Sequence, residues 1–516
     1  MGHEIELKLE IPRQQARQLA GSAWLKKLAC GPVQKKHLVS VYYDTDDLTL
    51  RDNQSMLRVR RVDGRFVQTF KAQAMGTGAL SRLQWEVPIQ GPKPDLRRAH
   101  KRDTGGLNLK KLRKSLKPIF ETTVSRTIVP VRYRGSLLEL AIDQGQVKTG
   151  RLRLPIHEIE VELKKGRPQA VIALGKKLAS KLQAAFGVLS KAERGYALRR
   201  SKVNQSVCAT PVVLSPNMMA AEAFEAIAMS CLHHFAANRR AVMAERSEGV
   251  HQMRVGLRRL RAAISLFEDV LGGPETERIK TDLKWLTEEL GPARDMDVLM
   301  EETIDPLVES TPQPRSANAL KNDIESKRDK DFTRALVAVQ SDRYRHLVLQ
   351  TALWIMGGRW RKYGADLVVA RRKMSVQQFA TQELGRRAAK IVKKLDKIED
   401  LSSKQQHKLR IAVKKLRYAV EYFESLYNGK QITRRRKGFA EILKALQSSL
   451  GKLNDIRVHW ALARKYADEK RRRRNAVPKA FAMGLLSGQE RTRVSGLLKA
   501  AKRDGKCLSR HAPFWE

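Results

Sequence analysis

The sequence is poor in several features that define common protein classes. Four cysteines are scattered over 516 residues without a CxxC pair, which argues against a disulfide framework and favours a reducing compartment. Aromatic residues make up only 6% of the chain, too few to favour single-stranded nucleic acid as a partner. The N-terminal MGHEIELKLE has no apolar core, and no run approaches 18 apolar residues. We therefore expect a soluble, cytoplasmic protein without membrane insertion.

Acidic residues are scarce relative to basic ones. The chain has 54 Asp and Glu against 101 Lys and Arg, a formal net charge of +47, with 42% hydrophobic residues. Residues 1–205 hold 41 basic and 18 acidic residues, and residues 206–516 hold 60 and 36. Because this excess is spread over a chain of globular composition, we expect a folded protein that binds polyanions: nucleic acid, an anionic membrane surface or phosphate polymers.

Two kinds of periodicity divide the chain. Up to about residue 200, alternation of apolar and polar residues predicts antiparallel strands at 4–11, 55–62, 65–72, 83–89, 137–143 and 157–164. Helical patterns over 168–187 and from 190 close this part. From about 218, apolar residues recur every three or four positions, which predicts helices, with breaks at 272–274, 291–292, 305–314, 357–358 and 428–429.

The helical part contains an internal repeat. VHQMRVGLRRLRAAISLFEDVL from 250 aligns with QHKLRIAVKKLRYAVEYFESLY from 406. LKWLTEELGPARDMDVL from 283 aligns with LKALQSSLGKLNDIRVH from 443, so that Lys284 matches Lys444 and Asp295 matches Asp455. We expect two related helical bundles that face each other in one domain.

Charged residues occupy one face of several predicted strands, because residues i and i+2 share a face. An exposed sheet face would explain any one of these strands, whereas several together predict a barrel with a polar lumen. Carboxylates in such a lumen suit Mg²⁺ or Mn²⁺, and Arg and Lys suit a polyphosphate. The charged residues concerned are Glu4, Glu6, Lys8, Arg58, Arg60, Glu139, Asp143, Glu158, Glu160 and Glu162.

The first 200 residues resemble the CYTH domains, the triphosphate tunnel metalloenzymes. EIELK at 4–8 is similar to their ExExK signature. Further motifs follow in the order of that family: YYDT at 42–45, LRVR at 57–60, TFK at 69–71, WE at 85–86, FETTVSRT at 120–127, ELAID at 139–143, EIEVEL at 158–163 and SKAERGY at 190–196. The resemblance implies an eight-stranded tunnel that hydrolyses or cyclises a terminal triphosphate with a divalent metal, by electrostatic stabilisation and a metal-polarised water.

The resemblance also implies roles for individual residues. Metal ligands would be Glu4, Glu6, Glu160 and Glu162. Phosphate ligands would be Lys8, Arg58, Arg60, Lys71, Arg126 and Lys191. Further acidic groups, which would support these or hold a second metal, are Glu86, Glu139 and Asp143. Glu193 and Arg194 belong to the SKAERGY motif, but a pair at the surface beside the closing helix would explain these two residues as well as a role in the site.

Each long helical repeat carries a basic stripe. At 100° per residue, His251, Arg254, Arg258 and Arg261 share a narrow face, and so do His407, Arg410, Lys414 and Arg417. The opposite faces are apolar, with Met253, Leu257, Leu260, Ile264 and Phe267 in the first repeat and Leu409, Val413, Leu416, Val420 and Phe423 in the second. A solvated face or a polyanion site would explain the stripes; the two histidines would cap carbonyls or donate to phosphate.

HxxRxxxRRLR at 251–261 and HKLRIAVKKLR at 407–417 resemble the CHAD domain, a family of duplicated helical bundles. The resemblance implies that phosphate and long-chain inorganic polyphosphate bind between the two bundles, without catalysis there. Lys284 and Lys444 would extend the site, and Asp295 and Asp455 would orient it or cap helix ends.

These observations predict an α+β protein of two domains. Residues 1–204 would form an eight-stranded antiparallel tunnel with flanking helices, 205–217 a linker, and 218–510 an all-α domain with repeats at about 218–345 and 346–510. The predicted function is metal-dependent hydrolysis of inorganic triphosphate (PPPi) to pyrophosphate and phosphate, with polyphosphate binding by the helical domain, at polyphosphate granules in the cytoplasm. The alternatives are a non-catalytic polyphosphate-binding adaptor, an adenylate cyclase or a nucleoside triphosphatase, with nucleic acid bound only opportunistically.

Overall fold

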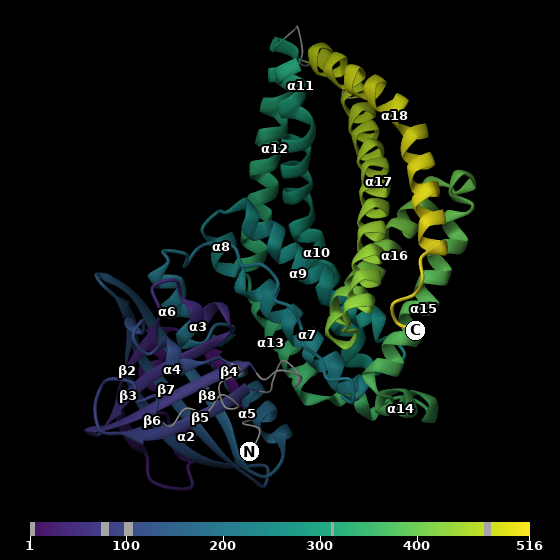
Figure 1. The fold of residues 1–516 in the computed structure, drawn as a ribbon. Coiled ribbons are helices and arrows are strands. Elements are labelled where there is room, and N and C mark those ends of the chain that lie inside the picture. Colours follow the sequence, from purple (N-terminus) through teal and green to yellow (C-terminus); the bar gives the residue numbers. More distant parts are fainter. Residues whose placement is uncertain (1–5, 74–81, 98–106, 311–313, 469–475) are drawn as a thin grey trace.

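The alternating sequences of the first 165 residues form one antiparallel sheet (Figure 1). The computed structural model describes residues 6–73, 82–97, 107–310, 314–468 and 476–516, so the predicted metal ligand Glu4 lies outside the described residues. The strands are β1 (Glu6–Glu10), β2 (Gln34–Asp44), β3 (Ser55–Val62), β4 (Arg65–Gln73), β5 (Arg82–Ile89), β6 (Lys117–Tyr133), β7 (Ser136–Thr149), β8 (Leu152–Lys165) and β9 (Ala185–Phe186).

The sheet order is β5-β4-β3-β2-β6-β7-β8-β1-β9. The α+β fold class is confirmed, but two details differ from the predicted eight-stranded barrel. The described residues form nine strands, because the short β9 adds to β1 through Leu9 and Phe186. No pairing within this part of the chain joins β5 to the other edge, so the sheet is open along one side.

Short helices cover the sheet and close one end of it. They are α1 (Arg13–Leu19), α2 (Ala23–Lys26), α3 (Thr49–Asp52), α4 (Leu109–Leu112), α5 (Pro168–Lys181) and α6 (Lys191–Arg199). Helix α5 contacts β1, β7 and β8, where Val171, Leu174 and Leu178 are buried. Helix α6 begins at Ser190 with a capping box completed by Glu193, which fixes its first turn against the sheet.

The remainder of the chain is helical, as predicted. Its main helices are α7 (Ala220–Ala237), α8 (Arg239–Met243), α9 (Ser247–Leu266), α10 (Pro274–Leu299), α11 (Asp305–Ser310), α12 (Pro314–Gln340), α13 (Asp342–Gly357), α14 (Asp366–Lys373), α15 (Val376–Leu395), α16 (Ser403–Tyr422), α17 (Lys430–Asp468) and α18 (Ala476–Arg510). None of the helices among the described residues is both long and apolar enough to span a bilayer.

The predicted break at 291–292 is wrong, because α10 continues through Gly291 and Pro292. A proline inside a helix removes one hydrogen bond and crowds the preceding turn. Here α10 packs against α9 and α12, with Leu286, Leu290 and Ala293 buried. Tertiary packing therefore outweighs the local preference for a break.

The apolar faces predicted for the two repeats are confirmed. Met253, Leu257 and Leu260 on α9, and Leu409, Val413 and Leu416 on α16, are fully buried. Reciprocal polar contacts join these helices: Arg259 on α9 pairs with Glu421 at the end of α16, and Lys415 on α16 donates to Ser265 on α9 at 2.8 Å. Because Arg259 matches Lys415 and Ser265 matches Glu421 in the repeat alignment, the two repeats meet around a local twofold axis.

The segment 205–217, predicted as a linker, packs closely on the helical part. Val212 and Leu214 are buried. The Leu214 amide donates to Ser425 Oγ at 2.8 Å, and the Val207 amide donates to Asn238 Oδ1 at 2.8 Å. The segment is therefore anchored on the helical part by backbone hydrogen bonds as well as by buried side chains.

Candidate anion-binding sites

Three rows of charged residues cross the inner face of strands β6, β7, β8 and β1. Register places Arg126 opposite Asp143, Asp143 opposite Glu158, and Glu158 opposite Glu10. The next row pairs Ala141, Glu160 and Lys8, and the third pairs Glu139, Glu162 and Glu6. The structure therefore brings most of the predicted tunnel residues of these strands onto one surface.

The first two rows and α6 form a dense network of ion pairs. Lys191, the first residue of α6, contacts Asp143 at 2.7 Å and Glu160 at 2.9 Å, and it also pairs with Glu158. Arg126 donates to both oxygens of Asp143, at 2.7 and 2.6 Å, and pairs with Glu160. Lys8 Nζ lies 3.6 Å from Glu160 Oε1. Glu160 thus accepts contacts from three cations.

The pKa shifts show how strongly these charges interact. Burial opposes ionisation of Glu160, but Lys191, Lys8 and Arg126 outweigh it and hold the Glu160 pKa well below its usual range. Burial likewise disfavours the charged form of Lys191, but Glu160, Asp143 and Glu158 raise its pKa. Glu160 and Lys191 therefore stabilise each other's charged forms.

Sequence reasoning placed Glu158 on the charged face but gave it no role, and it placed Arg194 at the surface as a plausible alternative. Both are buried in the network: the Arg194 side chain is 2% exposed and pairs with Glu158, and with Glu10 at 3.2 Å. Glu193 instead caps α6. The three alternating glutamates of HEIEVEL were the available signal for Glu158, whereas the burial of Arg194 depends on how α6 packs.

Carboxylates in this cluster have the chemistry of a hard-cation site. Ligand oxygens of Asp143, Glu158 and Glu160 lie within 4.8 Å of one another, and oxygen donors are what Mg²⁺ and Mn²⁺ prefer. Glu162 and Glu139 continue the acidic surface, where Lys164 lies 2.7 Å from Glu162 and 3.7 Å from Glu139. The donor set fits a divalent ion. Glu160 lies between the cations that contact it and the acidic residues Glu162 and Glu139.

Strands β3, β4 and β5 carry a second inner surface, which we call the cation wall: Arg58, Arg60 and Lys71, with Thr69 and Glu86. Arg58 Nε donates to Thr69 Oγ1 at 3.2 Å, and Arg60 Nε donates to Ser40 Oγ at 3.0 Å. Thr69 in turn donates to Glu86 at 3.2 Å. Neither arginine forms an ion pair with a carboxylate within the described ranges, so both guanidinium groups keep capacity for an anion.

The pKa shifts around the cation wall also indicate that it can bind an anion. Burial, followed by repulsion from Arg58, lowers the pKa of Arg60 to about 10. Burial would raise the pKa of Tyr42, but Arg58, Arg60 and Lys191 outweigh it and lower that pKa. A buried tyrosine that is easier to ionise indicates a strongly positive potential, which a bound polyphosphate would relieve.

The helical repeats bring their basic stripes together between α9 and α16. We call the group Arg254, Arg258, Arg410 and Lys414 the helical cation cluster. Arg254 lies 3.2 Å from Asp295 on α10, and Arg410 is near Asp455 on α17 and Arg258 on α9. Buried nitrogens of Arg254, Arg258 and Arg410 have no hydrogen-bond partner among the described residues.

Burial lowers the pKa values of several cations in this cluster, because few carboxylates lie near enough to offset it. Burial, then repulsion from Arg410 and Arg258, lowers the pKa of Lys414 to about 7. The pKa values of Arg254 and Arg410 are also lowered, mainly by burial. Buried cations that lack partners are costly, and phosphate oxygens would satisfy them.

Of the other predicted residues of this site, His251 lies near Arg254 and Arg258, and Arg417 lies near Lys414, while the rest make contacts of their own. His407 Nδ1 is 2.8 Å from Asn454 Oδ1, and the buried Nδ1 of His251 has no partner in the described part of the chain. Arg417 lies over the Tyr418 ring at 5.7 Å, and burial lowers the pKa of Arg261. Lys284 and Lys444 are mostly exposed and pair within their own helices, with Glu288 and Glu441.

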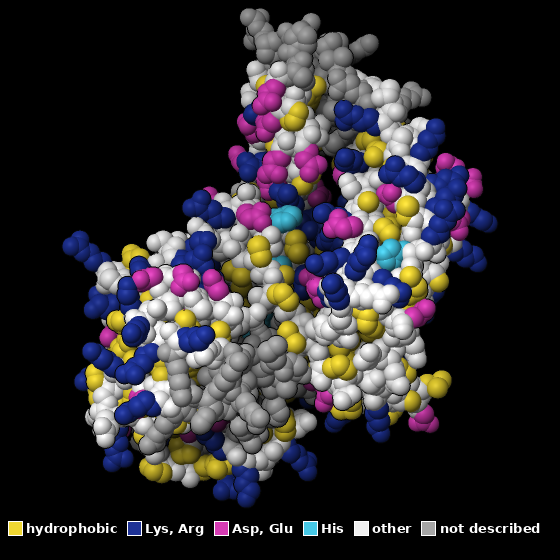
Figure 2. All heavy atoms as spheres, in the orientation of Figure 1, with side chains coloured by type: hydrophobic (Ala, Val, Ile, Leu, Met, Phe, Trp, Pro, Cys, Tyr) yellow, Lys and Arg dark blue, Asp and Glu magenta, His cyan; other side chains and the backbone are white. Residues whose placement is uncertain are grey.

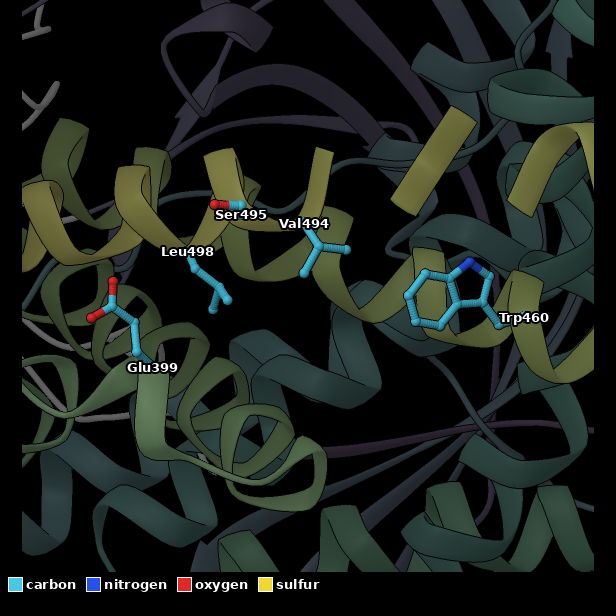
Figure 3. A pocket seen from close by; sticks show the side chains of 5 residues that line it. All are labelled: Glu399, Trp460, Val494, Ser495 and Leu498. Atoms are coloured by element: carbon cyan, nitrogen blue, oxygen red, sulfur yellow. The ribbon is translucent and has the colours of Figure 1, made fainter. Parts of the chain in front are cut away.

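Surface views separate this cluster from an unrelated pocket. Figure 2 shows Lys, Arg and His side chains gathered around a hollow between the two helical arms. A cavity of about 420 Å³ lies elsewhere, between α17, α18 and the turn before α16. Figure 3 shows its lining in the described part of the chain, Glu399, Trp460, Val494, Ser495 and Leu498; none of these five is a cation.

Comparisons with known families agree with this division. The family model of the CYTH domain matches residues 2–196, and the model of the CHAD domain matches residues 226–464. A crystal structure of the CHAD domain from the plant Ricinus communis is similar to 58% of this chain over 96% of its own length, with 29% identity and a TM-score of 0.50.

Two curated proteins are similar in sequence. An inorganic triphosphatase of Haemophilus influenzae is 34% identical over 201 residues, 38% of this chain and 55% of that protein. An uncharacterized protein of Mycobacterium tuberculosis is 30% identical over 112 residues, 21% of this chain and 22% of that protein. The matched regions thus span about half or less of these relatives.

Proposed function

Because the chain joins a CYTH domain to a CHAD domain, we propose that it is a metal-dependent inorganic triphosphatase with a polyphosphate-binding module. The reaction is hydrolysis of PPPi to pyrophosphate and phosphate. The observation that carries the proposal is that one sheet carries both the cation wall and a carboxylate cluster, Asp143, Glu158 and Glu160, whose oxygens lie within 4.8 Å of one another. Similarity to a triphosphatase over the N-terminal part supports it.

In this proposal, the chain's own residues bind and orient the substrate. Arg58, Arg60 and Lys71 grip phosphates from the cation wall, and Lys8, Arg126 and Lys191 grip them from the opposite rows. Fixed cations of this kind also stabilise charge that develops on the phosphate oxygens during transfer, without reorganising in the transition state.

Carboxylates would hold the divalent ion. Glu4, Glu6, Glu160 and Glu162 are the proposed ligands, with Asp143, Glu139 and Glu86 as further acidic groups, together with Glu158, which lies beside Asp143 and Glu160. A Mg²⁺ or Mn²⁺ ion bound there would neutralise phosphate charge and lower the pKa of a coordinated water. Lys191 and Arg126 hold Asp143 and Glu160 in place.

Free PPPi is a better fit than a nucleotide. The Tyr42 ring stacks on Phe120, with centroids 4.5 Å apart, and Tyr196 packs edge-on against Phe120 at 5.1 Å. This aromatic group is part of a buried core, so its faces are already covered and do not offer a platform for a base.

The helical cation cluster is the proposed polyphosphate site, because its buried nitrogens lack partners within the described part of the chain and its cations outnumber the neighbouring carboxylates. Binding there would place the protein at polyphosphate granules in the cytoplasm.

Phosphate release tests the function directly. PPPi, ATP and long-chain polyphosphate are compared side by side, with Mg²⁺, Mn²⁺ or EDTA, using the full chain. We expect rapid release from PPPi that EDTA abolishes. Release from ATP with inhibition by ATP of PPPi turnover would support the nucleotide alternative, and tight polyphosphate binding without any hydrolysis would support the adaptor alternative.

A further inference from the structure

The wall of the sheet that carries Lys8 shares its hydrophobic core with the helical domain. Leu7 and Leu9, on the outer face of β1, are fully buried in the same cluster as Phe224 on α7 and Leu353 on α13. Gly175 on α5 lies between them: a Cβ there would be 2.2 Å from Leu7 Cδ2 and 3.7 Å from Leu353 Cδ2. The helical domain therefore backs β1 through a contact that leaves no room for a side chain.

The short strand β9 extends this contact to the edge of β1. Phe186 pairs with Leu9, its ring meets His233 of α7 edge-on at 5.8 Å, and α13 packs against β9. The Gly187 amide then donates to the Lys8 carbonyl at 2.9 Å. Two helices of the helical domain thus hold β9 against the strand of Lys8.

Gly187 touches the Lys8 side chain itself. A Cβ on Gly187 would lie 2.6 Å from Lys8 Cγ, 3.0 Å from Cδ and 3.2 Å from Cβ. These Lys8 atoms are close to the backbone, so the Lys8 side chain could not move away from the new methyl group without displacing its ammonium group. That ammonium group lies 3.6 Å from Glu160. Lys8 therefore needs a residue without a side chain at position 187.

We propose that Gly187 is a positioning residue for Lys8, and that the helical domain, by holding β9 and β1, sets the grip of Lys8 on the substrate. The inference rests on the proposed function for its kinetic readout. It gives the helical domain a role in the tunnel that is separate from polyphosphate binding.

The first test substitutes Gly187→Ala in the full chain, alone and together with Lys8→Ala. We expect KM for PPPi to rise about tenfold with little change in kcat, because Lys8 grips bound substrate and transition state alike and one hydrogen bond to a charged group contributes at least about 1.5 kcal/mol. In the Lys8→Ala background the same substitution should add nothing. Gly91→Ala is the matched control, since a Cβ at Gly91 meets no atom within 4 Å.

The second test asks whether the helical domain contributes. Leu353→Ala on α13 should raise KM for PPPi, whereas Leu443→Ala, also fully buried but on α17, which packs against α16 and α18, should lower the unfolding temperature without changing KM. Equal KM values for these two variants would overturn the role of the helical domain.

The role of Gly187 would be overturned by an unchanged KM in Gly187→Ala, or by an equal rise in the presence and absence of Lys8. If the wild-type protein releases no phosphate from PPPi, the proposed function fails by itself. Calorimetric PPPi binding in EDTA then decides the inference, because Gly187→Ala should still weaken binding only when Lys8 is present.

Discussion

The network of ion pairs around Lys191, Arg126 and Glu160, which we call the tunnel cluster, and the helical cation cluster both bury arginine and lysine. They differ in the partners that these cations have. Lys191 and Arg126 in the tunnel each contact at least two carboxylates, which outweigh burial and raise both pKa values. Arg254, Arg410 and Lys414 have few acidic neighbours, and burial lowers their pKa values.

The opposite directions of these pKa shifts indicate that the two clusters have different functions. Cations short of partners gain most from an anionic ligand, so a site made almost only of them suits binding. Carboxylates that are kept beside such cations weaken anion binding, and they are useful where a metal must also be held. The comparison predicts that the two sites fail independently.

The largest expected effect follows from breaking the tunnel cluster. Glu160→Ala should lower metal-dependent PPPi hydrolysis by roughly 10²–10³-fold, because it removes a carboxylate that contacts three cations and is itself a proposed metal ligand. Phosphate release measures this loss, and polyphosphate binding should be retained. Glu160→Gln controls for folding, and undiminished turnover in both variants would remove Glu160 from the site.

A smaller effect is expected from breaking the helical cluster. Arg254→Ala combined with Arg410→Ala should weaken long-chain polyphosphate binding by roughly 10²-fold, since hydrogen bonds to charged groups contribute about 1.5 kcal/mol each at the low end of their range. Fluorescence anisotropy with labelled polyphosphate measures the affinity, and PPPi turnover should be unchanged.

The exposed pair Lys284→Ala with Lys444→Ala is the matched control for charge. Because both lysines are mostly exposed and their ion pairs among the described residues lie within their own helices, we expect a change of less than about twofold. Loss of PPPi turnover in the arginine variant would instead indicate one shared site.

The smallest expected effect is a pH dependence confined to the helical cluster. The Lys414 pKa is about 7, so its ammonium is present below pH 7 and is lost as pH rises through that value. Polyphosphate affinity should therefore fall about tenfold at most between pH 6 and pH 8, the value of one charged hydrogen bond. Lys414→Arg, which stays charged, should flatten the profile; equal slopes would assign the titration to another group.

Patterns along the chain predicted the core of both domains. Alternation predicted β1, β3, β4, β5, β7 and β8, and helical periodicity predicted the buried faces of α9 and α16. It did not predict β2 or β6, where Ser40, Thr122 and Thr127 occupy buried positions and blur the alternation, although family motifs lie in both strands. The extra strand β9 is only two residues long, and its pairing depends on the helices behind it.

The sites were predicted less completely, for a physical reason. Residues that share a strand face or a helix face can be read from spacing, as for Arg58 with Arg60 or Arg254 with Arg258. Other contacts join residues of separate elements, such as Asp295 with Arg254 and Arg194 with Glu158. These contacts depend on how the elements pack, which the spacing of residues along the sequence does not specify.

The reciprocal contacts between α9 and α16 make the interface of the two repeats isologous: each helix uses the same positions to meet the other. A polymer lying across such an axis meets nearly the same donors whichever way it runs. Inorganic polyphosphate has identical ends, so both orientations are equivalent for it, whereas a nucleic acid strand has a direction that this arrangement cannot read. For the proposed polyphosphate ligand, the duplication would make the two directions of binding equivalent.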